Sequence, residues 1–423
     1  MLNSSFAPPS FAPWPTFSDE ELASVERVLL SGKVNYWTGT EGREFEREFA
    51  SYCGTQHAVA LSNGTVALEV ILRCFGIGEG DEVIVTPRTF IASASAIAIV
   101  GAKPIFADVD AISQNITAAT VQPVLTPNTK AIIAVHLAGW PCDMDPLMSL
   151  AQDHNLKVIE DCAQAHGATY RGIPVGGIGH AAAWSFCQDK IISTGGEGGM
   201  VTTNDSTLWG KIWSYKDHGK SWSAVHERQH PPGFKWLHES VGTNLRMTEM
   251  QAAIGRIQLG KLPHWNLTRR ENACRINETT RPFGIVRNIV WPDEIQHACY
   301  KHYVILNPER LKAGWNQNRI IQEISARGIP CFQGSCAEIY LEKCFEFKNL
   351  SPQTHLPVAK ILGETTLMFL VHPTLTKADI ANTCSVIEEV FALCSLPEDL
   401  TIQNYQRNCP AIPATLRGAY ASK

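Results

Sequence analysis

Residues 58–110 decide the fold class, because they alternate short apolar runs with longer amphipathic segments. In order, the chain reads AVALSNG (58–64), TVALEVILRCFG (65–76), EVIVTP (82–87), FIASASAIAIVG (90–101) and KPIFADVD (103–110). The first, third and fifth runs have the length and composition of buried strands, whereas the second and fourth have helical length. Strands joined by helices lie parallel, with helices on both faces of the sheet. The stretch therefore predicts a doubly wound α/β domain.

The same alternation continues on both sides of this stretch. Further apolar runs downstream are AIIAVHL (131–137), KVIEDC (157–162) and AAAWSF (181–186), with the helical segment DMDPLMSLAQDHN (143–155) among them. Upstream, Ser18 followed by three acidic residues predicts a helix N-cap, and Gly32 predicts the end of that helix. We expect one large sheet domain from residue 18 onward.

A second, smaller region is expected from residue 262. The segment 261–281, KLPHWNLTRRENACRINETTR, predicts a long helix that leaves the large domain. After it, strand-like and helix-like runs alternate irregularly, which is typical of an α+β arrangement. The predicted division is an N-terminal arm (1–17), a large α/β domain (18–261), a small α+β domain (262–397) and an unassigned tail (398–423).

Composition narrows the class of partner. The 423 residues are 44% hydrophobic and 18% charged, which is ordinary for a globular protein. A formal net charge of -5, without a dense basic stripe, argues against nucleic acid and favours a small-molecule ligand.

Cysteine spacing and apolar runs indicate the compartment. The 13 cysteines include no C-x-x-C pair, so neither a zinc knuckle nor a redox dithiol is indicated, and no metal is predicted. The first 18 residues lack the charged and apolar regions of a secretory signal, and no apolar run reaches about 18 residues. We expect a cytoplasmic protein without a membrane partner.

Ligands of open α/β sheets bind beyond the carboxyl ends of the strands, so the residues that follow each strand are the candidates. Gly64 and Thr65 lie in a turn of small residues before a helix, where free backbone N–H groups suit a phosphate. The alternative is a plain helix cap by Asn63 or Thr65. Phe90 follows the next strand, and its ring could stack on a flat heterocycle or belong to the core.

Two carboxyl-end segments carry stronger candidates. Asp161 ends a strand, where it could cap the next helix or pair with a protonated ring nitrogen of a ligand, and Gln164 could donate to an oxygen on that ring. Lys190 follows another strand within small and apolar neighbours and precedes a glycine-rich stretch, 195–199. A lone lysine is usually a surface charge, but partial burial there would favour a nucleophilic amine. Ser185, five residues earlier, is placed to contact a phosphate.

Five motifs in order resemble the DegT/DnrJ/StrS family of sugar aminotransferases. They are SNGTVAL (62–68), TFIASASAI (89–97), EDCAQAHG (160–167), SFCQDK with GGEGGMVTTND (185–190 and 195–205), and GTNLRMTEMQAAIG (242–255). The resemblance extends over roughly residues 17–393 and is dense from 45 to 259. It implies the fold-type-I architecture, pyridoxal 5'-phosphate as the cofactor and a homodimer with shared active sites.

The resemblance also implies roles for individual residues. Lys190 corresponds to the lysine that binds the cofactor covalently, Asp161 to the partner of the pyridine nitrogen, and Gln164 to the residue near the ring hydroxyl. Phe90 corresponds to the stacking aromatic. The corresponding phosphate contacts are Gly64, Thr65, Ser185 and, from the neighbouring subunit, Asn244. An alternative for Asn244 is that it caps the helix that begins near residue 247.

The implied activity is transfer of an amino group from an amino acid, L-glutamate in the family, to a nucleotide-linked keto-sugar during amino-sugar or cell-surface polysaccharide biosynthesis. A sugar dehydratase and a non-catalytic cofactor-binding regulator are the alternatives. In the dehydratase branch a histidine replaces the lysine, so Lys190 favours the transaminase. Many relatives carry a histidine shortly before the lysine, whereas here residues 187–189 are Cys, Gln and Asp. The roles of residues 36–38 and 328–345 stay open.

Overall fold

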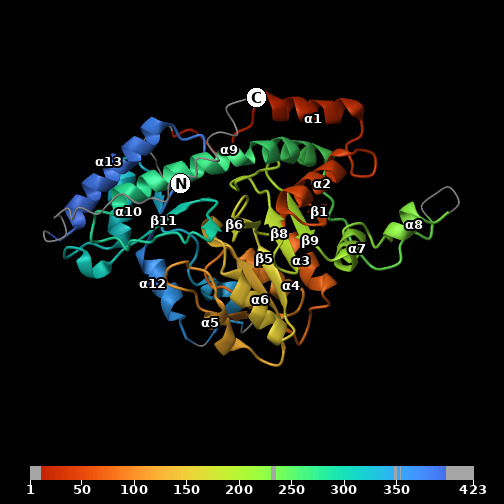
Figure 1. Ribbon diagram of the computed structural model, residues 1–423, viewed down its shortest axis with the longest axis horizontal. Coiled ribbons are helices and arrows are strands. Elements are labelled where there is room, and N and C mark those ends of the chain that lie inside the picture. Colours follow the sequence, from red (N-terminus) through yellow and green to blue (C-terminus); the bar gives the residue numbers. More distant parts are fainter. Residues whose placement is uncertain (1–10, 230–234, 347–349, 353, 397–423) are drawn as a thin grey trace.

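A mostly parallel sheet forms the centre of the molecule (Figure 1). The computed structural model describes residues 11–229, 235–346, 350–352 and 354–396, and within them this sheet has seven strands in the order β1-β9-β8-β5-β4-β2-β3. The strands are β1 (His57–Leu61), β2 (Glu82–Val85), β3 (Lys103–Phe106), β4 (Thr129–Val135), β5 (Lys157–Asp161), β8 (Ala181–Ser185) and β9 (Gly199–Thr203). Strands β8, β5, β4, β2 and β3 pair in parallel, whereas β9 is antiparallel to both β8 and β1. The predicted α/β class is confirmed.

Helices cover both faces of the sheet, as the alternation of side chains along β4 shows. Ala131 and Ile133 pack into one core with α3, α4 and α7, while Ile132 and Ala134 pack into another with α5 and α6. Successive side chains of a strand point to opposite faces, so an apolar run of this kind requires cover on both sides. These helices are α3 (Gly64–Cys74), α4 (Ala92–Ile99), α5 (Ala118–Val121), α6 (Met144–Asp153) and α7 (Ser206–Tyr215).

The longest helix among the described residues, α9 (Glu249–Thr280), runs along one side of the molecule and connects its two parts (Figure 1). It packs against α1 (Asp19–Ser31) and α2 (Glu41–Cys53) at one end and against α13 (Lys377–Cys394) towards the other. Helix α1 has the predicted N-cap at Ser18, which forms a capping box with Glu21, and it ends as predicted at Gly32, which is in a left-handed conformation.

The C-terminal region is a smaller α+β unit. Its antiparallel sheet has the order β11-β13-β12, and side chains from α9, α10 and α13 form a separate core with it. The strands are β11 (His302–Ile305), β12 (Cys331–Phe332) and β13 (Thr366–Phe369), and the helices are α10 (Gln317–Ala326), α11 (Lys343–Glu346) and α12 (Pro357–Thr365). The remaining elements are β6 (Thr169–Tyr170), β7 (Ile173–Pro174), α8 (Trp222–His226) and β10 (Ile295–Gln296).

The predicted boundary at residue 262 falls inside α9, which continues through Pro263. The helix expected near residue 247 and the helix expected at 261–281 are therefore one continuous helix. Residues 1–10 of the arm and the tail from 398 onward lie outside the described residues. The four-part division itself stays a prediction.

A buried carboxylate next to the candidate site joins β5 to the segment 176–179. Glu160 accepts hydrogen bonds from the backbone N–H groups of Gly176, Ile178 and Gly179 at 2.7–2.9 Å, and its Oε2 lies 3.1 Å from Nε2 of His136. Nδ1 of His136 accepts from the backbone N–H of Cys142, so Nε2 carries the proton and donates to Glu160. Burial raises the pKa of Glu160, but His136 and the backbone donors outweigh it, and the pKa lies below its ordinary value of 4.5.

We expect Glu160→Gln to destabilise the protein by about 2–4 kcal/mol, because either orientation of the amide places its NH₂ group against two donors. The depressed pKa gives this contribution a pH dependence: it is present above 4.5 and is lost as the pH falls through the folded-state pKa. Thermal unfolding should therefore show a difference in Tm at pH 7 that shrinks below pH 4.5. Glu26→Gln, at an exposed position of α1, is the control. Equal Tm values at pH 7 would contradict the role of Glu160.

Candidate active site

Strand register brings the predicted phosphate contacts together. Gly199 in β9 lies opposite both Leu61 at the end of β1 and Ser185 at the end of β8. The carboxyl ends of β1 and β8 therefore meet at one edge of the sheet, where α3 begins at Gly64. A Cβ at Gly64 would lie 2.6 Å from Cβ of Ser185, so only glycine allows this approach.

The start of α3 offers free backbone donors to this edge. The N-cap is Asn63, as one alternative predicted, and its side chain accepts from the backbone N–H of Val66 at 3.0 Å. Gly64 and the half-buried Thr65 come before Val66 in the first turn, and their backbone N–H groups have no partner within the helix. Together with the Ser185 hydroxyl, they form a set of donors suited to a phosphate.

Asp161 lies at the same edge, at the end of β5, and is 6% exposed. Its Oδ2 accepts from the Ser93 hydroxyl at 2.7 Å and its Oδ1 from the backbone N–H of Ala163 at 3.1 Å. Residues 162–168 form turns, so the alternative of a helix cap is wrong. Burial raises the pKa of Asp161, against the opposing hydrogen bonds and the positive charge of Lys190.

Gln164 is buried beside the turn that follows β4. Its Oε1 accepts from the backbone N–H of Ala138 at 2.7 Å, which leaves the Nε2 amino group as the donor of this side chain. Ala138 belongs to the 3₁₀ turn η2 (Leu137–Gly139) and has a φ of 56°, in the left-handed region. The side chain of Gln164 is therefore held in one orientation, and its Nε2 has no hydrogen-bond partner in the described part of the chain, which leaves it available to a ligand.

Lys190 is not a surface charge, since its side chain is 14% exposed. Its Nζ lies 3.6 Å from Oδ1 of Asp189 and 5.2 Å from the centroid of the Tyr300 ring, which comes from the C-terminal region. Its backbone carbonyl accepts from the indole N–H of Trp14 at 2.8 Å. The lysine is thus positioned by the arm, the large domain and the small region together.

The other predicted residues are accessible from outside the chain. Phe90 is 65% exposed and lies just before α4, so the alternative of a core residue is wrong and the ring is available for stacking. Asn244 is exposed, and its Oδ1 accepts from the backbone N–H of Arg246 at 3.4 Å. It does not cap α9, because Thr248 is the N-cap of that helix. Its amide nitrogen is unpaired as far as the described segments extend, so it is available to another subunit.

Two segments with open roles differ in where they lie. Tyr36 is buried, and its hydroxyl donates to Glu46 at 3.0 Å and accepts from the indole of Trp213, whereas Thr38 is exposed. In the segment 328–345, the backbone N–H of Ser335 donates to the hydroxyl of Tyr303 at 3.1 Å. This segment therefore approaches the pocket described next.

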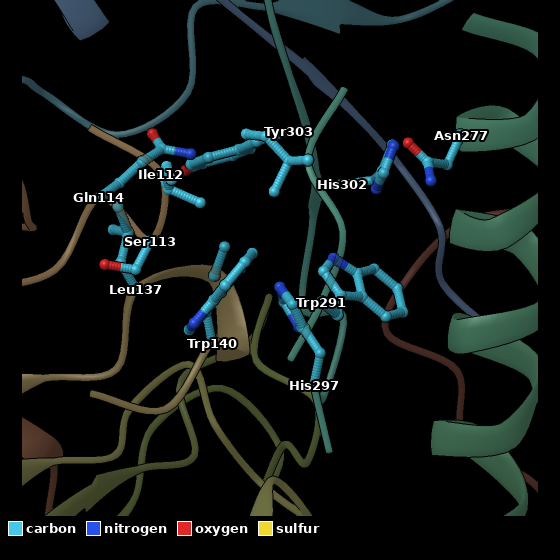
Figure 2. Close-up of a pocket in the computed structure, with 12 residues that line it drawn as sticks. Ile112, Ser113, Gln114, Leu137, Trp140, Asn277, Trp291, His297, His302 and Tyr303 are labelled. Atoms are coloured by element: carbon cyan, nitrogen blue, oxygen red, sulfur yellow. The ribbon is translucent and has the colours of Figure 1, made fainter. Parts of the chain in front are cut away.

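A pocket adjoins the site at Ala138, whose backbone N–H donates to Gln164. It lies between the segments 112–114 and 137–140 of the large domain and the segment 289–303 of the C-terminal region, with Asn277 of α9 beside His302 (Figure 2). Its lining includes Gln114, Trp140, Trp291, His297 and Tyr303 and contains no carboxylate, lysine or arginine side chain. Burial lowers the pKa of His302 to about 4, so this ring is neutral at pH 7. The pocket suits an uncharged polar group.

Sequence reasoning missed several residues that complete the site. Ser93, which donates to Asp161, lay inside a quoted motif and could have been found as a small polar residue in the first turn of a helix. Trp14, Tyr300 and the neighbouring Lys301 carried no local signal, because they reach Lys190 from distant segments.

Comparison with known families identifies the chain. The model of the DegT/DnrJ/EryC1/StrS aminotransferase family matches residues 15–388. The chain belongs to this family. The resemblance found in the five motifs is confirmed, and so is the aminotransferase class.

Individual members of the DegT/DnrJ/EryC1/StrS family support this assignment. A curated UDP-N-acetyl-3-dehydro-alpha-D-glucosamine 3-aminotransferase from Acidithiobacillus ferrooxidans is 36% identical over 377 residues, which is 89% of this chain and 94% of the relative. The crystal structure of an aminotransferase from Psychrobacter cryohalolentis is 56% identical, covers 91% of this chain and 99% of its own, and superposes with a TM-score of 0.89. Neither the dehydratase nor the regulator is favoured.

A Streptococcus pneumoniae protein with the same fold has been solved in PLP and PMP forms. Both structures are 25% identical to this chain, cover 91% of it and 99% of their own chain, and superpose with TM-scores of 0.79 and 0.81. Among the described residues of this family member, no helix combines the length and the apolar content needed to cross a membrane.

The close contact between Gly64 and Ser185 can be tested by Gly64→Ala. We expect a loss of roughly 1–3 kcal/mol in stability, because the new methyl group meets a side chain whose backbone is fixed in β8. Gly210→Ala in α7 is a matched control, since its Cβ meets nothing within 4 Å and a helical alanine should stabilise by about 0.5–1 kcal/mol. Thermal denaturation measures both. A Gly64→Ala protein as stable as the parent would contradict the tight approach.

Proposed function

We propose that the protein transfers an amino group from an amino acid, L-glutamate by family resemblance, to a nucleotide-linked keto-sugar, with pyridoxal 5'-phosphate as its cofactor. The observation that carries this proposal is the convergence of Lys190, Asp161 and the Gly64–Ser185 contact at one edge of the sheet. The A. ferrooxidans relative, named for amino transfer at a dehydro position of a UDP-sugar, supports the acceptor class.

The residues present fit this cofactor. A phosphate would meet the backbone N–H groups of Gly64 and Thr65 and the hydroxyl of Ser185, in a space that a Cβ at residue 64 would fill. The exposed ring of Phe90 would stack on the pyridine ring, and Gln164 would donate to the ring hydroxyl. When bound, pyridoxal phosphate supplies an electron sink for the electron pair of a carbon next to the nitrogen.

Asp161 supplies the charge that this chemistry needs. Among the described residues, no cationic side chain forms an ion pair with its buried carboxylate, and only Ser93 and Ala163 donate hydrogen bonds to it. A protonated ring nitrogen beside it would offset the cost of burying the negative charge, and Asp161 would keep that nitrogen protonated.

Lys190 would bind the cofactor covalently and, once released, carry the proton. Its amine is close enough to Asp189 to be oriented, and the Trp14 indole holds its backbone. A released amine in that position can take a proton from the donor carbon and return one, which is general acid–base catalysis by a single group.

A second subunit would complete the site. Asn244 lies exposed near the start of α9, from where its amide would reach the phosphate bound by a neighbouring chain. The protein would therefore act as a homodimer, as family resemblance also implies. A cytoplasmic location and a role in amino-sugar or cell-surface polysaccharide biosynthesis complete it.

Borohydride reduction of the cofactor-loaded protein tests the covalent link. We expect the label to map to the peptide that contains Lys190, because its amine lies at the same edge as Asp161 and the phosphate contacts. Lys190→Ala should remove both the label and amino transfer to nucleotide-linked keto-sugars. A label on another lysine, or keto-sugar amination at the parental rate by Lys190→Ala, would refute the proposed role.

Asp161→Asn tests the electrostatic role while keeping the size of the side chain. The neutral amide cannot stabilise the protonated ring nitrogen as the carboxylate would. We therefore expect turnover to fall roughly 100-fold or more. Bound cofactor, measured by absorbance, should remain. Asp153→Asn, at the exposed end of α6, is the control. An Asp161→Asn enzyme with parental turnover would exclude this role.

A further inference from the structure

We propose that Lys301, held in place by Arg269, binds the carboxylate of the amino donor next to Lys190. This inference rests on the proposed function, because it assigns a residue to the donor half of that reaction. It goes beyond the motifs, which end before either residue.

Lys301 shares an aromatic neighbour with Lys190. Its Nζ lies 4.8 Å from the centroid of the Tyr300 ring, and Nζ of Lys190 lies 5.2 Å from the same centroid. Lys301 immediately precedes β11, whose first residue, His302, appears in Figure 2 beside the pocket. The amine therefore comes from the C-terminal region to the same aromatic ring that Lys190 contacts.

The charges around Lys301 do not balance. Lys190 and Arg269 both act on Lys301 through space, whereas the nearby carboxylates are Asp189 and, beside Lys190, Asp161. Asp189 already pairs with Lys190 and accepts from the Tyr300 hydroxyl. Among the described residues, no hydrogen bond or ion pair satisfies the Lys301 amine. A desolvated cluster with excess positive charge favours an anionic ligand.

Arg269 is a buried cation with most of its donors unused. It is 1% exposed, and its Nη1 donates to the backbone carbonyl of Tyr300 at 3.2 Å, while Nε and Nη2 have no partner among the described residues. Its guanidinium lies 4.8 Å from the centroid of the Trp14 ring. Burial lowers the pKa of Arg269 to about 10, which still leaves it charged at pH 7. It fixes the backbone before Lys301 and adds positive potential, so it is a positioning residue.

The protonation of Lys301 agrees with this role. Burial lowers its pKa to about 8, with Asp189 acting against this shift and Arg269 and Lys190 adding to it. The amine therefore keeps its proton at neutral pH but is weakly solvated. Such an amine gains more from an incoming carboxylate than a fully hydrated one, because less water must be removed.

The donor is the better source of the anion than the acceptor. In an amino acid the carboxylate is attached to the carbon that bears the amine, so it must lie close to the reacting amine of Lys190. The diphosphate of a nucleotide-linked sugar is several bonds away from the ketone carbon. A single compact amine beside Lys190 therefore matches a carboxylate on the reacting carbon.

The first test is binding of glutarate, an unreactive dicarboxylate, to the cofactor-loaded protein by calorimetry. Lys301→Met keeps the length of the side chain and removes its charge, and we expect affinity to fall roughly 10- to 100-fold. Lys301→Arg should recover part of it. Lys130→Met is the control, because Lys130 is exposed at the opposite end of the sheet, at the start of β4. Glutarate affinity unchanged in Lys301→Met would overturn the proposal.

The second test separates the two halves of the reaction by rapid-mixing absorbance. With L-glutamate, Lys301→Met should need a 10- to 100-fold higher concentration for the half-maximal rate of converting the cofactor from its aldehyde to its amine form. With preloaded amine-form enzyme, the dependence on nucleotide-linked keto-sugar should match that of Lys130→Met. A shift confined to the keto-sugar arm would place the anion on the acceptor and overturn the donor assignment.

Glutarate binding and keto-sugar amination can fail independently. A parent protein that binds glutarate through Lys301 but aminates no keto-sugar would retain the carboxylate site and refute the sugar activity. If instead the parent protein aminates keto-sugars while Lys301→Met binds glutarate normally, the sugar activity would be supported and the carboxylate site at Lys301 would be refuted.

Discussion

The buried carboxylate of Asp161 is the constraint on which the site depends. A carboxylate that is 6% exposed and paired with no cation among the described residues is costly, and the protein supports it with Ser93 from the helix after β2 and with a turn after β5. These donors come from separate βα units, so the parallel order of β2, β4 and β5 must be correct before the carboxylate can be buried. The strand order that the fold requires therefore also sets the geometry around Asp161.

The antiparallel strand β9 imposes a second condition on the same edge. By pairing with both β1 and β8, it sets the start of α3 against Ser185, and Gly199 leaves room for the backbone of Asn63, which a Cβ would approach to 2.3 Å. The glycines at 64 and 199 are thus explained by close backbone packing rather than by flexibility. This backbone packing sets the spacing between the residues that would contact the phosphate.

Much of the large domain could be predicted, because its buried strands and short helices have distinct local compositions. Lys190, Asp161 and Gln164 could be singled out because they directly follow strands or belong to motifs. The contributions of Trp14, Tyr300 and Lys301 could not, since each depends on a contact between segments far apart in the chain. The continuity of α9 could not be predicted either: a helix start near residue 247 and a helix at 261–281 were both indicated, but Pro263 is typical of a break between helices rather than of a helix interior.

Helix α9 gives the molecule a mechanical property. At about 1.5 Å per residue, its 32 residues form a rod of roughly 48 Å that belongs to the cores of both parts. A rotation of the C-terminal region would have to bend this rod or carry α1 and α2 with it. The C-terminal region, which carries Lys301, is thereby mechanically coupled to the N-terminal helices.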